Sequence, residues 1–364
     1  MTITTPTPSA PATALRTPRR TPGGPSPLAR FIIVRFLLIF PTIFILVTMV
    51  FLLMRTIGDP ITAALGGRLN AQQLAERIEA AGYNRPILVQ YFEYIGQVFT
   101  GNFGTAISDG RPVSQLLLTY GGATLELAFY ALLVAFIVGI PLGMLTAYLR
   151  DRWPDAALRV FAILCYATPV FFAGLLLKLV FSVWLGVLPV AGRASTRTEL
   201  QMSRLENRTG IYLIDAIQLG SPAALADVLQ HAVLPGLALG LLTAGVFLRL
   251  VRTNVIGTLS MDYIDSARSR GVSEYRLVRK HAYKPALIPI ITVIGLQIAM
   301  LLGGAVLTET TFECKGLGFK LAEYLSARDF VAVQGIVALL AVIVALSNFI
   351  VDILAAIIDP RVRY

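Results

Sequence analysis

Six long stretches of this sequence are almost free of charged residues. A helix needs about 20 residues to cross a hydrocarbon layer roughly 30 Å thick, and each stretch is long enough to do so. The stretches are 36–54, 127–149, 160–188, 228–248, 286–308 and 330–358. Pro169 and Lys178 interrupt the third stretch, and Asp352 lies near the end of the last. The pattern predicts an all-α integral membrane protein with six transmembrane helices.

The amino-acid composition agrees with a membrane protein. The chain has 364 residues, of which 56% are hydrophobic and 14% are charged, whereas about a quarter of the residues in soluble domains are charged. Its 31 basic residues outnumber 21 acidic ones. This excess would hint at nucleic acid in a soluble protein, but positive loops are the ordinary consequence of topology in a membrane protein. The lipid bilayer is therefore an expected partner, and nucleic acid is not.

The basic residues gather in alternate loops between the predicted spans. One side has an excess of base in four places: the N-terminal tail, the loop with Arg150, Arg152 and Arg159, the loop 249–284, and the C-terminal tail with Arg361 and Arg363. Bases and acids nearly balance in the other segments, which are 55–123, 189–227 and 309–329. Loops rich in Lys and Arg stay in the cytoplasm. Both termini are therefore predicted to be cytoplasmic, in a multi-pass protein of the inner or plasma membrane.

Residues 1–30 form a separate segment. They contain seven prolines, four arginines and no acidic residue, and their apolar surface is too small to offset the entropy of ordering. A disordered, basic, proline-rich cytoplasmic tail is predicted, followed by a transmembrane domain over 31–364. A cleaved signal peptide is not expected, because the apolar run after the tail is longer than the apolar core of such peptides.

The segment 55–123, predicted to be extracytoplasmic, has folding signals of its own. Asn70 and Gln73 have the spacing of a capping box, and Gly82 is a typical stop for the helix that follows. A second helix with an apolar stripe is predicted from Pro86 to Gly101. Such a helix more often packs on the protein's own surface than binds a ligand. The segment 189–227 is polar with few periodic signals, and we interpret it as a long outer loop.

The segment 262–284, between the fourth and fifth spans, is basic and has a glycine at its centre. Its apolar positions recur every three or four residues, as on one face of a helix: Ile264, Ala267, Gly271, Tyr275 and Val278. Glycine is costly within a helix and serine is a typical N-cap residue. We therefore expect one helix to end near Gly271 and another to begin at Ser273. On the residues alone, a compact pair of helices that docks on a partner and a solvated surface loop are equally good interpretations.

Residues for enzymatic chemistry are scarce. No Gly-x-x-x-x-Gly-Lys-Ser/Thr stretch occurs, so this chain has no phosphate-binding loop for ATP. The two histidines, His231 and His281, and the two cysteines, Cys165 and Cys314, lack the spacing of a metal site. We predict no catalytic residue, no metal site and no cofactor bound by this chain. The two cysteines lie too far apart on this topology to form a disulfide bond.

Four ionisable residues lie at or near the predicted membrane depth: Glu126, Lys178, Glu309 and Asp352. Such residues are candidates for function by default. Positions at the membrane interface explain three of the four, and they explain Lys178 least well. A proton relay would need several such groups within one bundle, and the sequence offers no convincing set.

Several short motifs occur in a characteristic order. Asp265-Ser266-Ala267, Gly271, His281 and Pro289 resemble the EAA loop of the inner-membrane permeases of ATP-binding-cassette importers, with Asp265 where glutamate is usual. Further landmarks resemble the first permease subunit of the oligopeptide, dipeptide and nickel group: Gly58-Asp59-Pro60, Asn84-Arg85-Pro86, Gly101-Asn102-Phe103-Gly104, Ala123-Thr124-Leu125-Glu126-Leu127, Glu309-Thr310-Thr311-Phe312, Gly316-Leu317-Gly318 and Asp359-Pro360-Arg361. Glu313-Cys314-Lys315 departs from the Trp-Pro that is common before the Gly-Leu-Gly.

The resemblance implies a type I ATP-binding-cassette importer permease fold and a role in peptide uptake. The implied partners are a second homologous permease, two ATPase subunits that hold ATP and Mg, and an extracytoplasmic substrate-binding protein. This chain would line half of the translocation pathway, and its loop 252–284 would be a coupling helix seated on an ATPase subunit. The implied interface residues are Ile264, Asp265, Ser266, Ala267, Arg268, Gly271, Val272, Ser273, Tyr275 and Val278.

Other classes of membrane protein fit the sequence less well. A secondary transporter would need no ATPase and often shows inverted repeats and paired intramembrane charges, neither of which is evident. A membrane-embedded enzyme would need a catalytic constellation within the spans, and an exporter usually has a fused nucleotide-binding domain. Co-purification of an ATPase would separate the importer from the secondary transporter.

Overall fold

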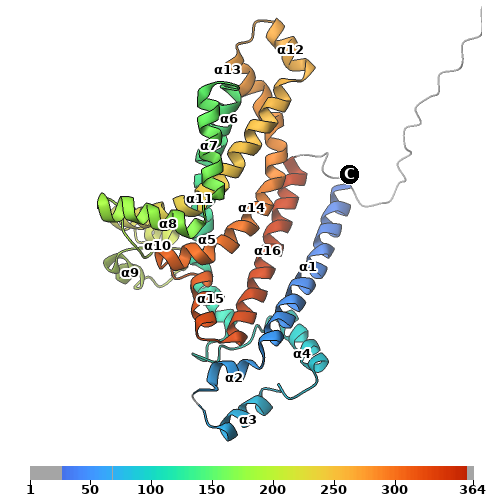
Figure 1. The fold of residues 1–364 in the computed structure, drawn as a ribbon, viewed down its shortest axis with the longest axis vertical. Coiled ribbons are helices and arrows are strands. Elements are labelled where there is room, and N and C mark those ends of the chain that lie inside the picture. Colours follow the sequence, from blue (N-terminus) through green and yellow to red (C-terminus); the bar gives the residue numbers. More distant parts are fainter. Residues whose placement is uncertain (1–26, 68, 359–364) are drawn as a thin grey trace, which may run out of the picture.

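The computed structural model describes residues 27–67 and 69–358, which are helical almost throughout (Figure 1). Within these ranges there is no strand, only an isolated antiparallel bridge between Thr105 and Pro112. The all-α prediction is confirmed. Long helices form a bundle, with α12 (Asp262–Ser269) and α13 (Glu274–Arg276) at one end, α2 (Pro60–Leu65), α3 (Ala71–Ala80) and α4 (Ile87–Phe99) at the other, and α8 (Val170–Leu177), α9 (Thr196–Met202) and α10 (Tyr212–Gln218) at its side (Figure 1).

The predicted spans lie on the long helices. The elements that contain them are α1 (Pro27–Ile57), α5 (Val113–Val134), η1 (Ala135–Gly139), α6 (Ile140–Tyr148), α7 (Trp153–Ala167), α8 (Val170–Leu177), η2 (Lys178–Trp184), α11 (Pro222–Leu259), α14 (Tyr283–Phe312) and α16 (Phe330–Ile358). Within the described residues, α1, the continuous α5–η1–α6 helix, α11 and α16 are long and apolar enough to cross a membrane. The count of six spans stays a prediction.

The third predicted span is broken. α7 ends at Ala167, and the helix formed by α8 and η2 leaves at an angle of 108° to it. Thr168 and Pro169 have the extended ψ angles 126° and 133°, because a proline ring disfavours the helical conformation of the residue before it. The stretch 160–188 is therefore broken at Pro169, one of the two residues that interrupt it in the sequence.

α11 is the centre of the bundle and packs closely against the helix α5–η1–α6. A Cβ atom added to Gly139 would lie 2.8 Å from the carbonyl oxygen of Ala244, and one added to Gly143 would lie 2.7 Å from the Cβ of Val251. Helix backbones approach this closely only where one side chain is absent. The two glycines thus allow the close packing of these helices.

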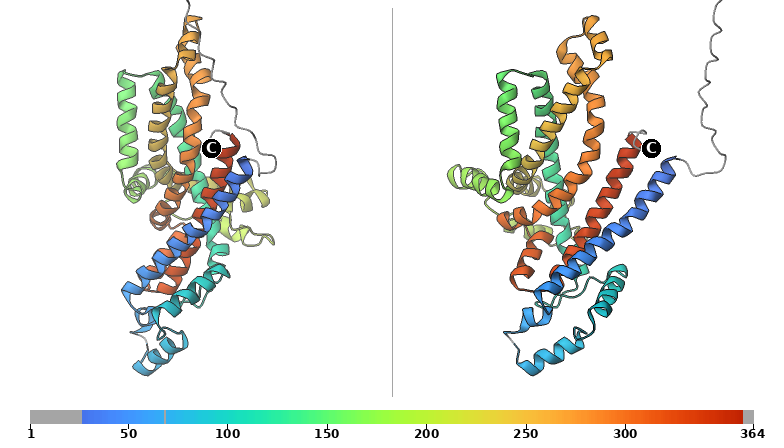
Figure 2. Two further views of the ribbon diagram at one scale, coloured as in Figure 1. Left: turned by 90° about the vertical axis from the view of Figure 1, so that its right-hand side faces the viewer. Right: turned by 45° about the vertical axis from the view of Figure 1, so that its right-hand side comes forward.

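The signals in 55–123 are largely confirmed. α3 (Ala71–Ala80) has the predicted capping box between Asn70 and Gln73, and the chain turns at Gly82 with φ +75°. α4 (Ile87–Phe99) lies along α1 (Figure 2), where the hydroxyl groups of Thr48 and Tyr91 are 2.6 Å apart. α2 (Pro60–Leu65) precedes them. However, α5 begins at Val113, so the helix of the second span starts within the segment assigned to the extracytoplasmic side.

The 189–227 segment is a folded unit and not merely a loop. It contains α9 (Thr196–Met202) and α10 (Tyr212–Gln218), and it ends in the first turns of α11. Met202, Tyr212 and Val228 are buried against one another. Ser195 is tied to α11 because both its backbone N–H and its hydroxyl donate to a carboxylate oxygen of Asp227, over 2.8 and 2.7 Å. The sequence did not predict these helices, because each has only seven residues and is too short for a clear helical repeat of apolar residues.

The first and last spans lie side by side and run in opposite directions (Figure 2). Arg35 near the start of α1 forms an ion pair of 3.2 Å with Asp352 near the end of α16. The described ends of the chain therefore lie at the same end of the bundle, as an even number of crossings requires. α1 begins at Pro27, so residues 27–30 of the predicted tail are helical. Residues 1–26 lie outside the described part.

Candidate functional site

The 262–284 segment projects from one end of the bundle (Figure 1). α12 (Asp262–Ser269) follows the end of α11, and α13 (Glu274–Arg276) follows the glycine turn. α13 continues through the π-helical turn η3 (Leu277–Ala282) directly into α14. The second half of the segment is thus the beginning of the fifth span and not an independent short helix.

Gly271 ends α12 as predicted. Its φ angle is +79°, in the left-handed region that glycine adopts without a Cβ penalty. The N–H of Gly271 donates to the carbonyl of Arg268 over 2.9 Å, and the N–H of Val272 donates to that of Ala267 over 3.3 Å. These bonds satisfy the last carbonyls of the helix. Ser273 holds the N-cap position of α13, but its side chain makes no capping hydrogen bond.

Burial divides the apolar residues of the segment into two groups. Ile264 and Ala267 are buried and pack with Leu277, while Val278 belongs to the core beneath the segment. These side chains support the fold of the segment from within. By contrast, 57% of Tyr275 is exposed, and Met261 and Tyr263 are exposed by 49% and 44%. Sequence periodicity missed Met261 and Tyr263 as surface groups.

An exposed ion-pair bridge crosses the glycine turn. The Nε of Arg268 donates to Glu274 over 2.6 Å, and its Nη1 donates to Asp265. The hydrogen bond that Arg268 donates to Glu274 raises the pKa of Arg268 above its usual value. The bridge joins α12 to α13 from the outside, while the cluster around Ile264 joins them from the inside. The segment is therefore held as one body.

A buried ion pair lies near the point where α11 leaves the bundle. The guanidinium of Arg252 donates to both carboxylate oxygens of Asp155, from Nε over 2.8 Å and from Nη2 over 2.7 Å. The Asp155 side chain is fully buried. It also accepts the backbone N–H of Asp151 over 3.2 Å. This pair fixes the start of α7 to α11, and the sequence analysis did not identify it.

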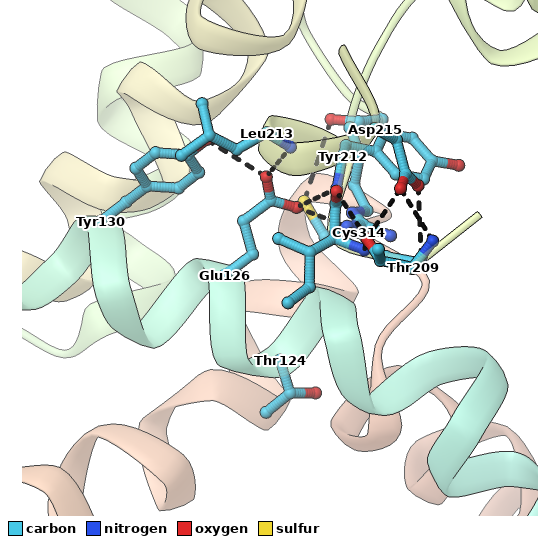
Figure 3. A network of polar contacts seen from close by, with 12 residues as sticks. Thr124, Glu126, Tyr130, Thr209, Tyr212, Leu213, Asp215 and Cys314 are labelled. Atoms are coloured by element: carbon cyan, nitrogen blue, oxygen red, sulfur yellow. Dashed lines mark hydrogen bonds and ion pairs between the residues drawn. The ribbon is translucent and has the colours of Figure 1, made fainter. Parts of the chain in front are cut away.

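A second polar network lies near the other end of α11 (Figure 3). Glu126 on α5 accepts hydrogen bonds from the backbone N–H groups of Tyr212 and Leu213, at 3.2 and 2.8 Å, and from the hydroxyl of Tyr130 at 3.1 Å. Arg193 pairs with the same carboxylate. Glu126 is 6% exposed. It is therefore a structural anchor for the 189–227 segment.

Glu309 is the centre of a third network, at the start of α15 (Leu317–Ser326). Its carboxylate accepts the Thr124 hydroxyl at 2.6 Å and the backbone N–H of Phe319 at 2.8 Å. The Thr124 oxygen in turn accepts the N–H of Leu317 at 2.9 Å. Thr124 on α5 and Glu309 on the preceding helix α14 thus satisfy free N–H groups at the start of α15. Glu309 therefore lies at the distance along the chain from Gly316-Leu317-Gly318 at which its carboxylate reaches the start of α15.

Replacing Gly316 by alanine should destabilise this junction by about 1–3 kcal/mol, the usual cost of overpacking. A Cβ at this position would lie 2.4 Å from the carboxylate of Glu309, which is completely buried and cannot move without losing its hydrogen bonds. Thermal unfolding of the purified protein in mild detergent measures the effect. Gly257→Ala is the control, because that helical position has no neighbour within 4 Å. Equal unfolding temperatures for both variants would contradict the assignment.

The remaining ionisable and sulfur groups also have defined places. The ammonium of Lys178 donates to the carbonyl of Thr311 over 2.8 Å and lies 5.5 Å from the ring centre of Phe312, so it connects η2 to α14. Cys165 and Cys314 are free thiols, as predicted. Burial raises the pKa of Cys314 to about 12.

Two family models match this chain. Residues 139–364 match the model described as the inner membrane component of binding-protein-dependent transport systems, and residues 28–112 match the model of the N-terminal part of such membrane components. The first match includes the whole 262–284 segment, and together the two matches include α1, α11, α14 and α16.

Curated relatives match along almost the whole chain. The chain is 37% identical to the di/tripeptide transport system permease protein DppB of Pseudomonas aeruginosa (strain UCBPP-PA14), over 92% of this chain and 98% of that protein. It is 39% identical to the probable D,D-dipeptide transport system permease protein DdpB of Escherichia coli (strain K12), over 84% and 88%. It is 34% identical to the glutathione transport system permease protein GsiC of Salmonella choleraesuis (strain SC-B67), over 93% and 100%.

A solved structure shares the fold. The chain aligns with an inward-facing conformation of the MetNI methionine ABC transporter with a TM-score of 0.50 and 16% identity, over 67% of this chain and 97% of that one. At this identity the likeness concerns the fold alone.

Proposed function

Because this chain belongs to the family of binding-protein-dependent transport system inner membrane components, we propose that it forms half of the translocation pathway of an ATP-driven importer of peptides. The match to permease subunits over more than nine-tenths of the chain carries this proposal. The apolar helices suit a multi-pass protein of the inner membrane. The chain acts as a transport subunit and not as an enzyme.

Peptides are the cargo that the relatives favour. Their names include di/tripeptide, dipeptide and glutathione systems, and all of these substrates are short peptides or close analogues. The substrate-binding protein would select among them outside the cell membrane. The permease then has to recognise only the features that short peptides share, such as a charged group at each end.

The 262–284 segment is the proposed seat of an ATPase subunit. Its exposed aromatic residues, Tyr263 and Tyr275, offer the contact area that interfaces use most often. Asp265, Ser266 and Arg268 lie beside them on the exposed side of α12. ATP and Mg would be bound by two such partner subunits, and a second permease and an extracytoplasmic binding protein would complete the importer. Both termini of this chain would then be cytoplasmic.

A rigid segment is what this role requires. Movement of an ATPase subunit is transmitted to the transmembrane helices only if the 262–284 segment does not deform. The buried contacts of Ile264 and the bridge formed by Arg268 hold α12 to α13. Since α13 runs without interruption into α14, movement of the segment would turn or tilt the fifth span.

The proposal is tested by replacing Gly271 with arginine in a tagged chain and purifying the chain in mild detergent. An arginine backbone at φ +79° costs about 1–2 kcal/mol. The turn should therefore change its conformation, and α12 should shift relative to α13. We expect the wild type to bring an ATPase with it, and the variant to lose the ATPase or to hydrolyse ATP without transport. Gly271→Asn is the matched control, because asparagine tolerates this conformation.

Two outcomes would count against the proposal in different ways. A folded wild-type chain that brings no ATPase activity would favour an ion-coupled secondary transporter. A Gly271→Arg variant that keeps ATP-coupled transport unchanged would leave the importer intact but would remove the 262–284 segment from the coupling interface.

A further inference from the structure

A hollow of about 480 Å³ opens between α5, the 189–227 segment and the turn that follows α14. Its lining includes Thr119, Arg193, Glu199, Arg208, Tyr212 and Lys315. It lies beside the first turns of α11, whereas the 262–284 segment follows the last turn. α11 has 38 residues and is about 57 Å long, because a helix rises about 1.5 Å per residue, and the two features lie toward its opposite ends.

Arg193 lines the hollow, and its contacts hold the side chain in one orientation. Its side chain is 12% exposed, and its guanidinium carbon is 3.7 Å from the ring centre of Tyr212. Nη2 pairs with Glu126 and donates to the carbonyl of Gly210 over 2.9 Å. The Nε and Nη1 groups make no hydrogen bond with any described residue. A nearly buried guanidinium thus presents unused donors in a defined plane.

Other charged residues of both signs line the hollow beside Arg193. Arg208 donates to the hydroxyl of Tyr212 over 3.3 Å and reaches Asp215 only at 3.9 Å, so its guanidinium keeps donors for another acceptor. Lys315 and Glu313 are exposed and form no ion pair within the described ranges. Glu199 accepts the Tyr212 hydroxyl at 3.1 Å. Three basic residues and two acidic ones therefore line one hollow.

A short peptide with free ends fits this pattern. It carries a carboxylate and an ammonium a few ångströms apart, and arginine binds carboxylates with two parallel, charge-assisted hydrogen bonds. The volume of the hollow lies within the range of about 300–1,000 Å³ that is usual for small-molecule sites. An apolar or singly charged solute would leave one set of these charged side chains without a counterpart.

We propose that this hollow receives the peptide on its way into the pathway, with Arg193 and Arg208 binding the terminal carboxylate and Glu199 or Glu313 facing the ammonium. The inference rests on the proposed function, because it takes peptides to be the cargo. It adds a place on the permease where a peptide is recognised by its ends.

Thiol labelling in the assembled importer tests this site. Thr119→Cys, in a chain with Cys165→Ala, places a thiol on the lining of the hollow. The native Cys314 should stay silent at pH 7, because its thiol is buried and its pKa is about 12. The importer is reconstituted in nanodiscs without its binding protein, and the rate of labelling by a charged maleimide is followed with Ala-Ala or with C-terminally amidated Ala-Ala.

We expect Ala-Ala to slow labelling roughly tenfold at ten times its Kd, and the amidated peptide to protect much less. Arg208→Gln should raise the concentration needed for protection about ten- to hundredfold, the usual effect of losing a charge-assisted hydrogen bond. Arg204→Gln is the matched control, because Arg204 is exposed in the same segment but does not line the hollow.

Uptake of labelled Ala-Ala, measured with binding protein in parallel vesicles, separates the two proposals. Uptake without protection of the thiol would overturn the peptide site and leave the importer. Protection that is unchanged by amidation of the peptide or by Arg208→Gln would also overturn the peptide site. Protection by peptide-free binding protein alone would overturn it too, because the hollow would then be a surface where that protein docks. Absence of both uptake and protection would refute the peptide cargo as well.

Discussion

Replacing Asp155 by alanine should destabilise the protein by about 3–5 kcal/mol, the usual cost of removing one partner of a buried ion pair. The change leaves the Arg252 guanidinium, whose side chain is 20% exposed, without its two acceptors. It also frees the start of α7 from α11. We expect a lower thermal unfolding temperature in mild detergent and a reduced yield of assembled importer.

The neighbourhood of Asp155 offers a matched control. Arg159 lies 3.6 Å from the same carboxylate, but its side chain is 52% exposed, so Arg159→Ala should cost at most about 1 kcal/mol. A combined Asp155→Leu and Arg252→Met variant removes both charges and should recover much of the lost stability. If Asp155→Ala behaves like Arg159→Ala, then the ion pair does not hold these helices together.

Replacing Glu126 by alanine should release the 189–227 segment from α5, again at a cost of about 3–5 kcal/mol. The change leaves Arg193 without a carboxylate and removes the acceptor of two backbone N–H groups at the start of α10. Limited proteolysis should then cut within 189–227 much faster than in the wild type, while the long helices stay protected. Glu126→Gln keeps an acceptor oxygen and should have an intermediate effect.

Glu206→Ala is the control for this experiment. Glu206 is exposed within the same segment, and exposed substitutions of this kind usually change stability by less than about 0.5 kcal/mol. Equal rates of proteolysis for Glu126→Ala and the wild type would mean that the buried contacts of Met202 and Tyr212 hold the segment without the carboxylate.

Local signals in the sequence predicted local structure well. Asn70 and Gln73 lie three residues apart and form the expected capping box, and Gly271 ends its helix because only a few residues on either side decide that turn. Long apolar runs likewise predicted helices, because the membrane imposes one length and one polarity on any segment that crosses it.

Contacts between distant segments could not be predicted from the sequence. Asp155 and Arg252 are 97 residues apart, and Glu126 and Leu213 are 87 apart. Asp155, Arg252 and Glu126 each resemble an ordinary charge at the end of a span, and only the fold brings them to their partners. The size of the bend after Ala167 could not be predicted for a related reason. Pro169 was visible, but a proline within a span produces anything from a slight kink to a complete break, depending on what packs around it.

The continuity of α11 ties the two proposed sites to one thermodynamic cycle. This helix packs against the 189–227 segment in its first turns, and its last residue, Leu259, contacts the cluster around Ile264. If an ATPase subunit seated at one end changes the affinity for peptide at the other by some factor, linkage requires the peptide to change the affinity for that subunit by the same factor. Measuring either affinity with and without the other ligand therefore yields a single coupling free energy, and the two measurements check each other.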